Sequence, residues 1–259
     1  MLVQNERIPV AVNSSDFTLK YRGEEIIKDS IFFDLEHYLY KEPIAIGVFG
    51  AAIYQEEKKA VVTTQYMIEN RKDARTILKM TRDYFESMKS DGKKYIVTFS
   101  GNNDFLVINH LFKKYEIDYN FAEEFELVDI QKEYEAKYNK NIGLKNLERL
   151  HQIERGGELI SGMTLAKTFS KIIKDHGYIK RMPEEKITRI MKYNEQDVVN
   201  LFNIMNQWEE VTMEDVLSLE EKLLDEKQIK LEMKRLLQLE SMKNQENTVP
   251  LEEMTGEMG

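Results

Sequence analysis

Three strand-like segments follow one another over about residues 31–66, and they constrain the fold more than any other feature of the sequence. The segments are IFFDLEHYLY, PIAIGVFGAAIY and KAVVTTQYMI, each rich in β-branched, aromatic or small apolar residues. We expect them to form an antiparallel meander. The core of the protein should therefore be built on a sheet that starts with these segments.

The pattern changes to helical spacing after Arg71. A helix is predicted from there to Gly92, and the apolar strand YIVTF follows at 95–99. A second helix is expected over about Asp104–Tyr115, and the segment FELVDI has strand character. Residues 131–180 read as helices broken by glycines, and a last helix should begin with Pro183 at its first position and run to about Trp208. This order predicts an α/β fold in which helices flank a mixed sheet.

Beyond Thr212 the sequence shifts to charged helix-forming residues. Apolar residues recur along this segment, among them Ile229, Met233 and Leu236. We expect one domain over residues 1–208 and a charged helical extension over 209–259, with a disordered tail after about Asn244. The extension is interpreted either as a helical lid on the domain or as a helix that binds a protein partner.

Composition excludes several classes of site. The chain of 259 residues has no cysteine, which removes disulfides, thiolate nucleophiles and the usual structural zinc sites. Its four histidines are widely separated, which disfavours a histidine metal site. The formal net charge of −9 disfavours a protein that coats nucleic acid by bulk electrostatics, but it does not exclude one whose carboxylates gather divalent cations that then meet a phosphate. No apolar run is long enough to span a bilayer, and we expect a cytoplasmic protein that is not attached to a membrane.

Asp34 and Glu36 lie two residues apart in the first strand-like segment. Side chains alternate along a strand, so both carboxylates should leave the same face while Phe33 and Leu35 point to the other. Two carboxylates directed together repel each other unless a cation lies between them. The alternative is an exposed strand face that binds nothing.

Asp104 falls on the same helical face as Val107, Ile108 and Leu111, the stripe that should pack on the sheet. A charge directed toward a core is normally paired or bound to a metal. The alternative is that Asp104 is the N-cap of its helix.

Asp197 lies at the margin of the apolar stripe of the last long helix, and Tyr193 precedes it by four residues. One helix edge therefore offers a phenol and a carboxylate together. Asn194 falls within the apolar stripe and must find a polar partner if it is buried. The alternative for Asp197 is a boundary residue on a solvated helix.

A strand with Asp-x-Glu, a later helix that opens with Asp and a last helix with Tyr-x-x-x-Asp resemble the three exonuclease motifs of the DEDD superfamily, in its tyrosine-bearing DEDDy branch. The segments FFDLEHYLY, TFSGNNDFLVINHLF, GLKNLERL followed by ISGM, and YNEQDVVNL resemble bacterial YprB-type ribonuclease H-like proteins. The resemblance covers about residues 30–206. It implies an RNase H-like fold and a nuclease that acts on DNA or RNA.

The resemblance also implies the roles of individual residues. Asp34, Glu36, Asp104 and Asp197 would hold two Mg²⁺ or Mn²⁺ ions, and Tyr193 would orient the attacking water. Hard divalent cations prefer carboxylate oxygen, and a pair of them suits phosphodiester hydrolysis. The first hypothesis is thus a 3′–5′ exonuclease, with an RNA endonuclease as a variant. The second is a non-catalytic nucleic-acid-binding or scaffolding protein of the same fold.

Two further features are open to more than one interpretation. Asp129 either supports the metal ligands from behind or is an acid at a sheet end or turn, and the second interpretation is favoured. Basic residues concentrate before the last motif and either guide a phosphate backbone or form a solvated face. In the same segment Tyr178 is a candidate for stacking on a base. The basic residues are Lys171, Lys174, Lys180, Arg181, Lys186, Arg189 and Lys192.

Overall fold

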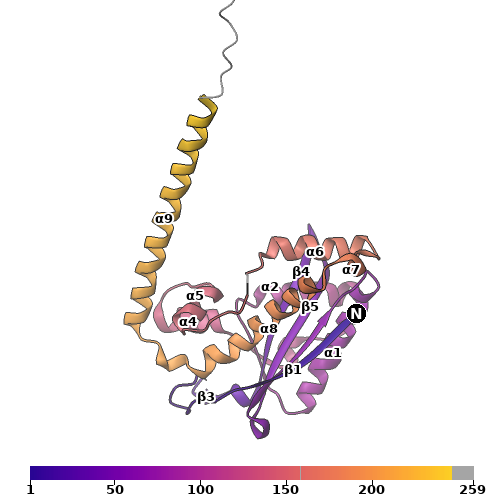
Figure 1. The fold of residues 1–259 in the computed structure, drawn as a ribbon. Helices are drawn as coiled ribbons and strands as arrows, with labels where there is room; N and C mark the ends of the chain where they lie inside the picture. The colour runs from indigo at the N-terminus through magenta and orange to yellow at the C-terminus, as the bar shows by residue number, and fades with distance from the viewer. Residues whose placement is uncertain (158, 247–259) are drawn as a thin grey trace, which may run out of the picture. The chain divides into compact units, whose positions relative to one another are not determined.

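In a computed structural model, residues 1–157 and 159–246 are described, and the part up to Val211 contains a six-stranded sheet with helices on both faces (Figure 1). The predicted disordered tail lies outside the described residues from position 247 on. The strand order is β1 (Leu2–Pro9), β6 (Ala60–Met67), β5 (Glu42–Gln55), β4 (Ser30–Tyr40), β7 (Tyr95–Thr98) and β8 (Glu126–Asp129). A separate hairpin consists of β2 (Lys20–Tyr21) and β3 (Glu24–Glu25).

The pairing of the strands confirms the predicted mixed sheet. β4, β5 and β6 are antiparallel neighbours, as the meander requires. β7 lies parallel to β4, and β8 lies parallel to β7. The parallel half forms because the chain crosses over through a helix before each of these strands.

The edge strand β1 was not predicted from the sequence. It pairs antiparallel with β6 over its whole length. Its residues LVQNERIP are mostly polar, and most of its side chains are exposed or half-buried. An edge strand of this kind lacks the apolar alternation that marks a strand in the sequence, because little of it is buried.

Helices cover both faces of the sheet, and aromatic contacts show which helix lies where. Phe33 of β4 packs on Phe85 and Phe105 with ring centroids 5.4 and 5.9 Å apart, whereas its neighbour Phe32 packs on Phe202 at 5.7 Å. Since successive side chains of a strand point to opposite faces, the helices that carry Phe85 and Phe105 lie on one face and the helix that carries Phe202 lies on the other. These helices are α1 (Asp73–Ser90), α2 (Asn102–Lys114) and α8 (Glu184–Asn206).

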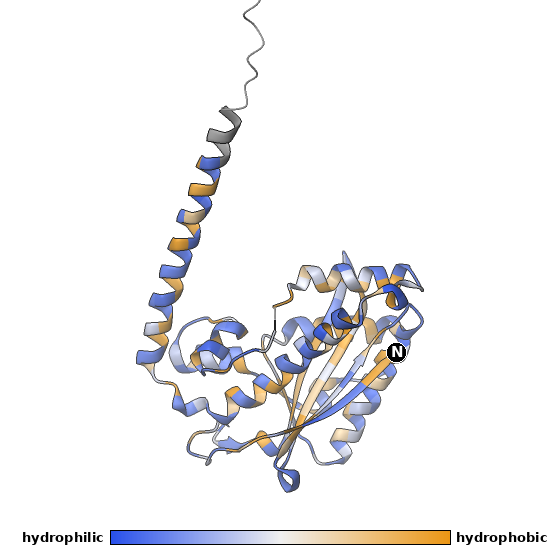
Figure 2. Cartoon of the chain, viewed as in Figure 1, coloured by the Kyte–Doolittle hydropathy of each residue, from blue (hydrophilic) through white to orange (hydrophobic). Residues whose placement is uncertain are grey.

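Shorter elements complete the domain, and hydrophobic residues concentrate in the strands of the sheet (Figure 2). The segment predicted to be helical and irregular contains four short helices separated by loops. The further elements are α3 (Phe121–Glu124), α4 (Ile130–Tyr138), α5 (Leu144–Leu150), α6 (Gly162–Lys174), α7 (Tyr178–Arg181), and the 3-10 helices η1 (Ile27–Asp29), η2 (Glu56–Lys58) and η3 (Trp208–Glu210).

Two helix starts differ from the predicted positions, one by two residues and the other by one. α2 begins at Asn102, so Asp104 is its third residue. α8 begins at Glu184, and Pro183 precedes it with an extended ψ of 136°. Proline here ends the incoming loop, and the acids Glu184 and Glu185 occupy the first turn, where the helix dipole favours negative charge.

The chain divides into two compact units, Met1–Val211 and the part from Thr212 on. The second unit contains α9 (Met213–Glu246), a single helix along which the side chains of Ile229, Met233 and Leu236 are exposed. The lid and the protein partner predicted for this helix stay predictions, as does the domain boundary at residue 208. Among the described residues, no helix is both long enough and apolar enough to cross a membrane.

Two glycines of β5 allow helices to approach the sheet closely. A Cβ atom at Gly47 would lie 2.4 Å from the ring of Phe169 in α6, and one at Gly50 would lie 2.1 Å from Asn194 Oδ1 in α8. Real Cβ atoms do not approach other atoms this closely. The absence of a side chain at Gly50 therefore sets the depth at which α8 sits on β4 and β5.

We expect Gly50→Ala to destabilise the protein by about 1–3 kcal/mol, because Asn194 is fully buried and its displacement strains a packed core. The matched control is Gly162→Ala in the first turn of α6, since a Cβ there meets nothing within 4 Å. Urea unfolding would measure both free energies, and the control should change by no more than roughly 0.5 kcal/mol. Equal stabilities of the two variants would contradict the close packing of α8 on Gly50.

Candidate active site

The strand β4 supplies the first two carboxylates. Asp34 and Glu36 project from the face opposite to the buried Phe33 and Leu35, as predicted. The register with β5 shifts only after Glu36, between Glu36 and His37, so the alternation of side chains holds through both acids. The two carboxylates thus face the helix α8.

A network of side-chain amides fixes the orientation of Asp34. Asn194 Nδ2 donates a hydrogen bond to Asp34 Oδ2 at 3.0 Å, and Gln65 Nε2 donates to Asn194 Oδ1 at 2.8 Å. Gln65 Nε2 also donates to the Met191 carbonyl oxygen at 2.9 Å. The prediction that a buried Asn194 must find a polar partner is confirmed, and that partner belongs to the site.

Asp104 enters from the other side of the sheet. β7 runs parallel to β4 with Val97 opposite Phe32, so the chain leaves β7 beside Asp34 and turns at once into α2. Asp104 is only 8% exposed. The N-cap residue of α2 is Gly101, and the interpretation of Asp104 as an N-cap is therefore wrong.

The helix α8 supplies the remaining two groups. Asp197 is 6% exposed, so its interpretation as a solvated boundary residue is wrong. Tyr193, one turn earlier, is half-buried. Burial, and then the negative charges of Asp197 and Glu36, raise the pKa of the Tyr193 phenol above its ordinary value. Tyr193 is accordingly a protonated hydrogen-bond donor at neutral pH.

The structure brings acids of two separate elements, β4 and α8, together. Asp34, Glu36 and Asp197 each present a carboxylate oxygen, and these oxygens lie within 4.8 Å of one another. Asp104 of α2 is not one of these three acids, but its charge contributes to raising the pKa of both Asp34 and Glu36. Acids that are far apart in the sequence thus share one small, partly buried region.

Burial is the main cause of the raised pKa values in this cluster. Burial, and then the charges of Asp197 and Asp104, raise the pKa of Asp34 well above its ordinary value and that of Glu36 to about 8. Burial and the charge of Asp197 raise the pKa of Asp104 to about 8. Asp197 rises less, to about 6, because Arg155 opposes the effect of burial. Such a group of hard oxygen ligands fits a divalent cation, which would relieve the repulsion.

Several residues of the site were missed in the sequence. Arg155 pairs with Asp197 and Glu148, and Asn200 Nδ2 donates to Glu148 Oε1 at 2.8 Å. Lys145 Nζ lies 5.6 Å from the centre of the Tyr193 ring. Glu148 follows Leu147 in a short helix and reads as an ordinary charged residue. Arg155 lies in the loop that follows, where no periodicity predicts a direction.

Asp129 lies at the end of the sheet, which confirms the interpretation favoured from the sequence. Its Oδ1 accepts hydrogen bonds from the backbone N–H groups of Ser100 at 2.9 Å and of Gln131 at 3.0 Å. It therefore caps α4 and fixes the loop that leads into α2. Its negative charge also contributes to the raised pKa of Asp104.

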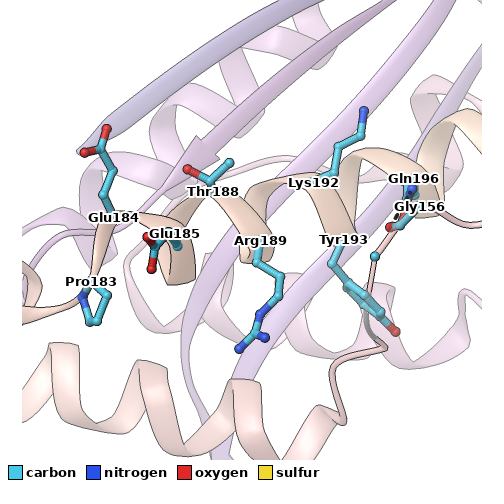
Figure 3. Close-up of a pocket in the computed structure, with 10 residues that line it drawn as sticks. Gly156, Pro183, Glu184, Glu185, Thr188, Arg189, Lys192, Tyr193 and Gln196 are labelled. Carbon is cyan, nitrogen blue, oxygen red and sulfur yellow. Dashed lines mark hydrogen bonds between the residues drawn. The ribbon is translucent and has the colours of Figure 1, made fainter.

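A pocket of about 820 Å³ adjoins the site along α8 (Figure 3). The side chains of Tyr193 and Arg189 extend from the same side of α8, one turn apart, and both line the pocket. Lys192 and the loop residues Gly156 and Gly157 also line the pocket. Members of the predicted basic cluster are partly paired: Arg181 with Asp175 and Lys192 with Glu195. The guidance of a phosphate backbone by this cluster and the stacking role of Tyr178 stay predictions.

The mixed sheet with an acidic cluster on its central strand defines an RNase H-like α/β domain. The sequence profile of the RNase H superfamily matches residues 31–209, which is more than half of the chain. The protein therefore belongs to the RNase H superfamily, and this membership points to a nucleic-acid hydrolase that uses divalent metal. No curated protein matches the sequence.

The raised pKa values predict how the metal-free protein responds to pH. A carboxyl whose pKa is higher in the folded state binds protons more tightly when folded, so it favours folding below its ordinary pKa near 4. That contribution is lost as the pH rises to about 8 for Glu36 and Asp104. Above this pH the four carboxylates repel one another and destabilise the fold.

We therefore expect Asp34→Asn to stabilise the metal-free protein at pH 8 by about 1 kcal/mol, or roughly 2–4 °C in Tm. The gain should shrink at pH 5, where the wild-type cluster is largely protonated. Mn²⁺ or Mg²⁺ should raise the Tm of the wild type and leave that of the variant nearly unchanged. Thermal unfolding in EDTA and in Mn²⁺ measures both effects, and a variant that is less stable at pH 8 in EDTA would contradict the repulsion.

Proposed function

We propose that the protein is a metal-dependent 3′–5′ exonuclease that hydrolyses phosphodiester bonds of single-stranded DNA or RNA. The observation that carries the proposal is the meeting of Asp34, Glu36 and Asp197 within 4.8 Å, and the charge of Asp104 also acts on Asp34. Structural ion pairs rarely bury several acids together without matching cations. Membership of the RNase H superfamily supports hydrolysis of nucleic acid as the reaction.

In this proposal the four carboxylates hold two Mg²⁺ or Mn²⁺ ions. When bound, such ions lower the pKa of a water and stabilise the charge that develops on the leaving oxygen. Asp34 joins the two parts of the site, since it accepts a hydrogen bond from Asn194 and lies within 4.8 Å of the carboxylates of Glu36 and Asp197. The amide of Asn194 donates to Asp34 Oδ2 and so fixes the orientation of the carboxylate. Asp34 Oδ1 takes no part in that hydrogen bond.

Tyr193 has a positioning role in this scheme. Because its phenol keeps its proton at neutral pH, Tyr193 donates a hydrogen bond and orients the attacking water instead of removing a proton from it. Two cations lie close to its ring, with Arg155 Cζ 5.4 Å and Lys145 Nζ 5.6 Å from its centre. These contacts hold the ring at the edge of the carboxylate cluster.

The pocket along α8 is the proposed path of the strand. It adjoins Tyr193, and the basic residue Arg189 lines it one turn away along α8, where it could meet a phosphate backbone. Gly156 and Gly157 also line this pocket and add no side chains to it. The strand that enters here reaches the carboxylates beside the phenol of Tyr193.

We expect the wild type to shorten labelled single-stranded DNA or RNA from one end in Mn²⁺ or Mg²⁺, but not in EDTA. Asp34→Asn should lower the rate by roughly a hundredfold or more, because it removes a charged metal ligand. The control is Asp16→Asn, the same chemical change at an exposed position. Denaturing gels would follow the products, and equal rates for the wild type and Asp34→Asn would exclude this site as the source of the activity.

Tyr193→Phe tests the positioning role. The variant should slow cleavage by about tenfold, since one hydrogen bond in the transition state is lost. Binding of Mn²⁺, measured by titration calorimetry, should be unchanged, because the phenol is not a metal ligand in the proposal. Complete loss of Mn²⁺ binding would show that the role of Tyr193 is wrong.

A further inference from the structure

Arg155, in the loop between α5 and α6, is built into the site by a buried ion pair. Its Nε donates to Glu148 Oε2 at 2.6 Å and its Nη2 to Glu148 Oε1 at 2.5 Å, and Nη2 also donates to Asp197 Oδ1. The side chains of Arg155 and Glu148 are 9% and 2% exposed. Asn200 donates a further hydrogen bond to Glu148. The guanidinium is thus held in one orientation from behind.

One nitrogen of this guanidinium makes no hydrogen bond to the part of the chain that the structure describes. Arg155 Nη1 is buried and has no hydrogen-bond partner within residues 1–157 and 159–246. The guanidinium is planar, and its five N–H groups point in fixed directions. The edge made by Nε and Nη2 is taken up by Glu148. The adjacent edge, made by Nη2 and Nη1, is the one that faces Asp197.

A purely structural ion pair does not account for the position of Nη1. Buried donors nearly always find an acceptor, because an unpaired one loses its hydrogen bonds to water. Every other polar contact of this guanidinium is made, and the remaining donor lies beside the Asp197 carboxylate at the site. A donor of this kind fits an oxygen atom that arrives with a ligand.

The charge and shape of the group indicate which ligand. Arginine pairs through two neighbouring N–H groups with the oxygen atoms of carboxylate or phosphate. The carboxylates here are already part of the protein, and the pocket beside Tyr193 is lined by Arg189 together with the acids Glu184 and Glu185. A phosphate oxygen is therefore the complementary partner for Nη1.

We propose that Arg155 is a further catalytic residue, which donates from Nη1 to a non-bridging oxygen of the phosphodiester while Glu148 and Asn200 position it. The inference rests on the proposed nuclease function and names the group that would contact its substrate. Arg155 supplies a fixed positive charge at the side of the cluster where Asp197 lies. Glu148 acts through Arg155 and is a positioning residue.

The test combines a change in the protein with a change in the strand. Short single-stranded DNA and RNA are prepared with one phosphodiester at a time replaced by the uncharged methylphosphonate. Affinities are measured by fluorescence anisotropy in Ca²⁺, with gels to check that the strands stay intact. For each linkage, the loss of affinity on replacement is compared between the wild type and Arg155→Gln, as in a double-mutant cycle.

We expect one linkage near the attacked end to differ between the proteins. There, the methylphosphonate should weaken strand binding by the wild type about tenfold more than strand binding by the Arg155→Gln variant. Arg75→Gln, at an exposed position of α1, is the control for the loss of one positive charge and should behave like the wild type. Arg155→Lys keeps the charge beside Glu148 but lacks Nη1, and it should behave like Arg155→Gln. It also provides the test if Arg155→Gln does not fold, as judged by circular dichroism.

Equal losses in the wild type and both Arg155 variants at every linkage would overturn the inference, because Arg155 would then be only a structural link. That result is distinct from failure of the proposed function. A wild type that shortens strands with metal but shows no such difference retains its function without this role for Arg155. A wild type that neither binds nor shortens strands would overturn both.

Discussion

Mutual repulsion of carboxylates is the constraint on which the rest of the site depends. The carboxyl groups of Asp34, Glu36 and Asp197 lie so close together that ionising all of them costs free energy. Asp104 adds a fourth negative charge. The sheet and helices must hold these groups together against this force. The large buried core around β4, β5 and α8 supplies the stability for this, since β4 and α8 carry both core residues and acids of the site.

The protein meets the repulsion differently on its two sides. On the β4 side, Asp34 receives a neutral amide donor from Asn194, which Gln65 orients in turn. On the α8 side, Asp197 receives the cation Arg155, and its pKa is accordingly raised less than those of Glu36 and Asp104. On the β4 side the donor is neutral, so negative charge is left for a metal to balance. On the α8 side the cation Arg155 lies beside Tyr193, which lines the pocket.

Much of the fold could be predicted from the sequence because it follows from local patterns. The meander, α1 and the acids on one face of β4 depend on periodicity, which burial imposes on the chain. β1 was missed because an exposed edge needs no apolar pattern. Asp104 and Asp197 could be singled out in the sequence because a carboxylate on or beside an apolar stripe is unusual, and Asp34 and Glu36 because they share one face of a strand. Arg155 and Glu148 were not, because their pairing joins a loop to a short helix and leaves no regular spacing in the sequence.

The close approach of α8 to Gly50 links two positions that are far apart in the chain. The amide of Asn194 occupies the space that any side chain at position 50 would need. The two residues can therefore change only as a pair: a larger residue at 50 requires a smaller one at 194, and Asp34 then loses its amide donor. Among related chains, a glycine at the first position and an asparagine at the second should mark those that keep the acidic centre in working order, whereas loss of the pair should accompany its decay.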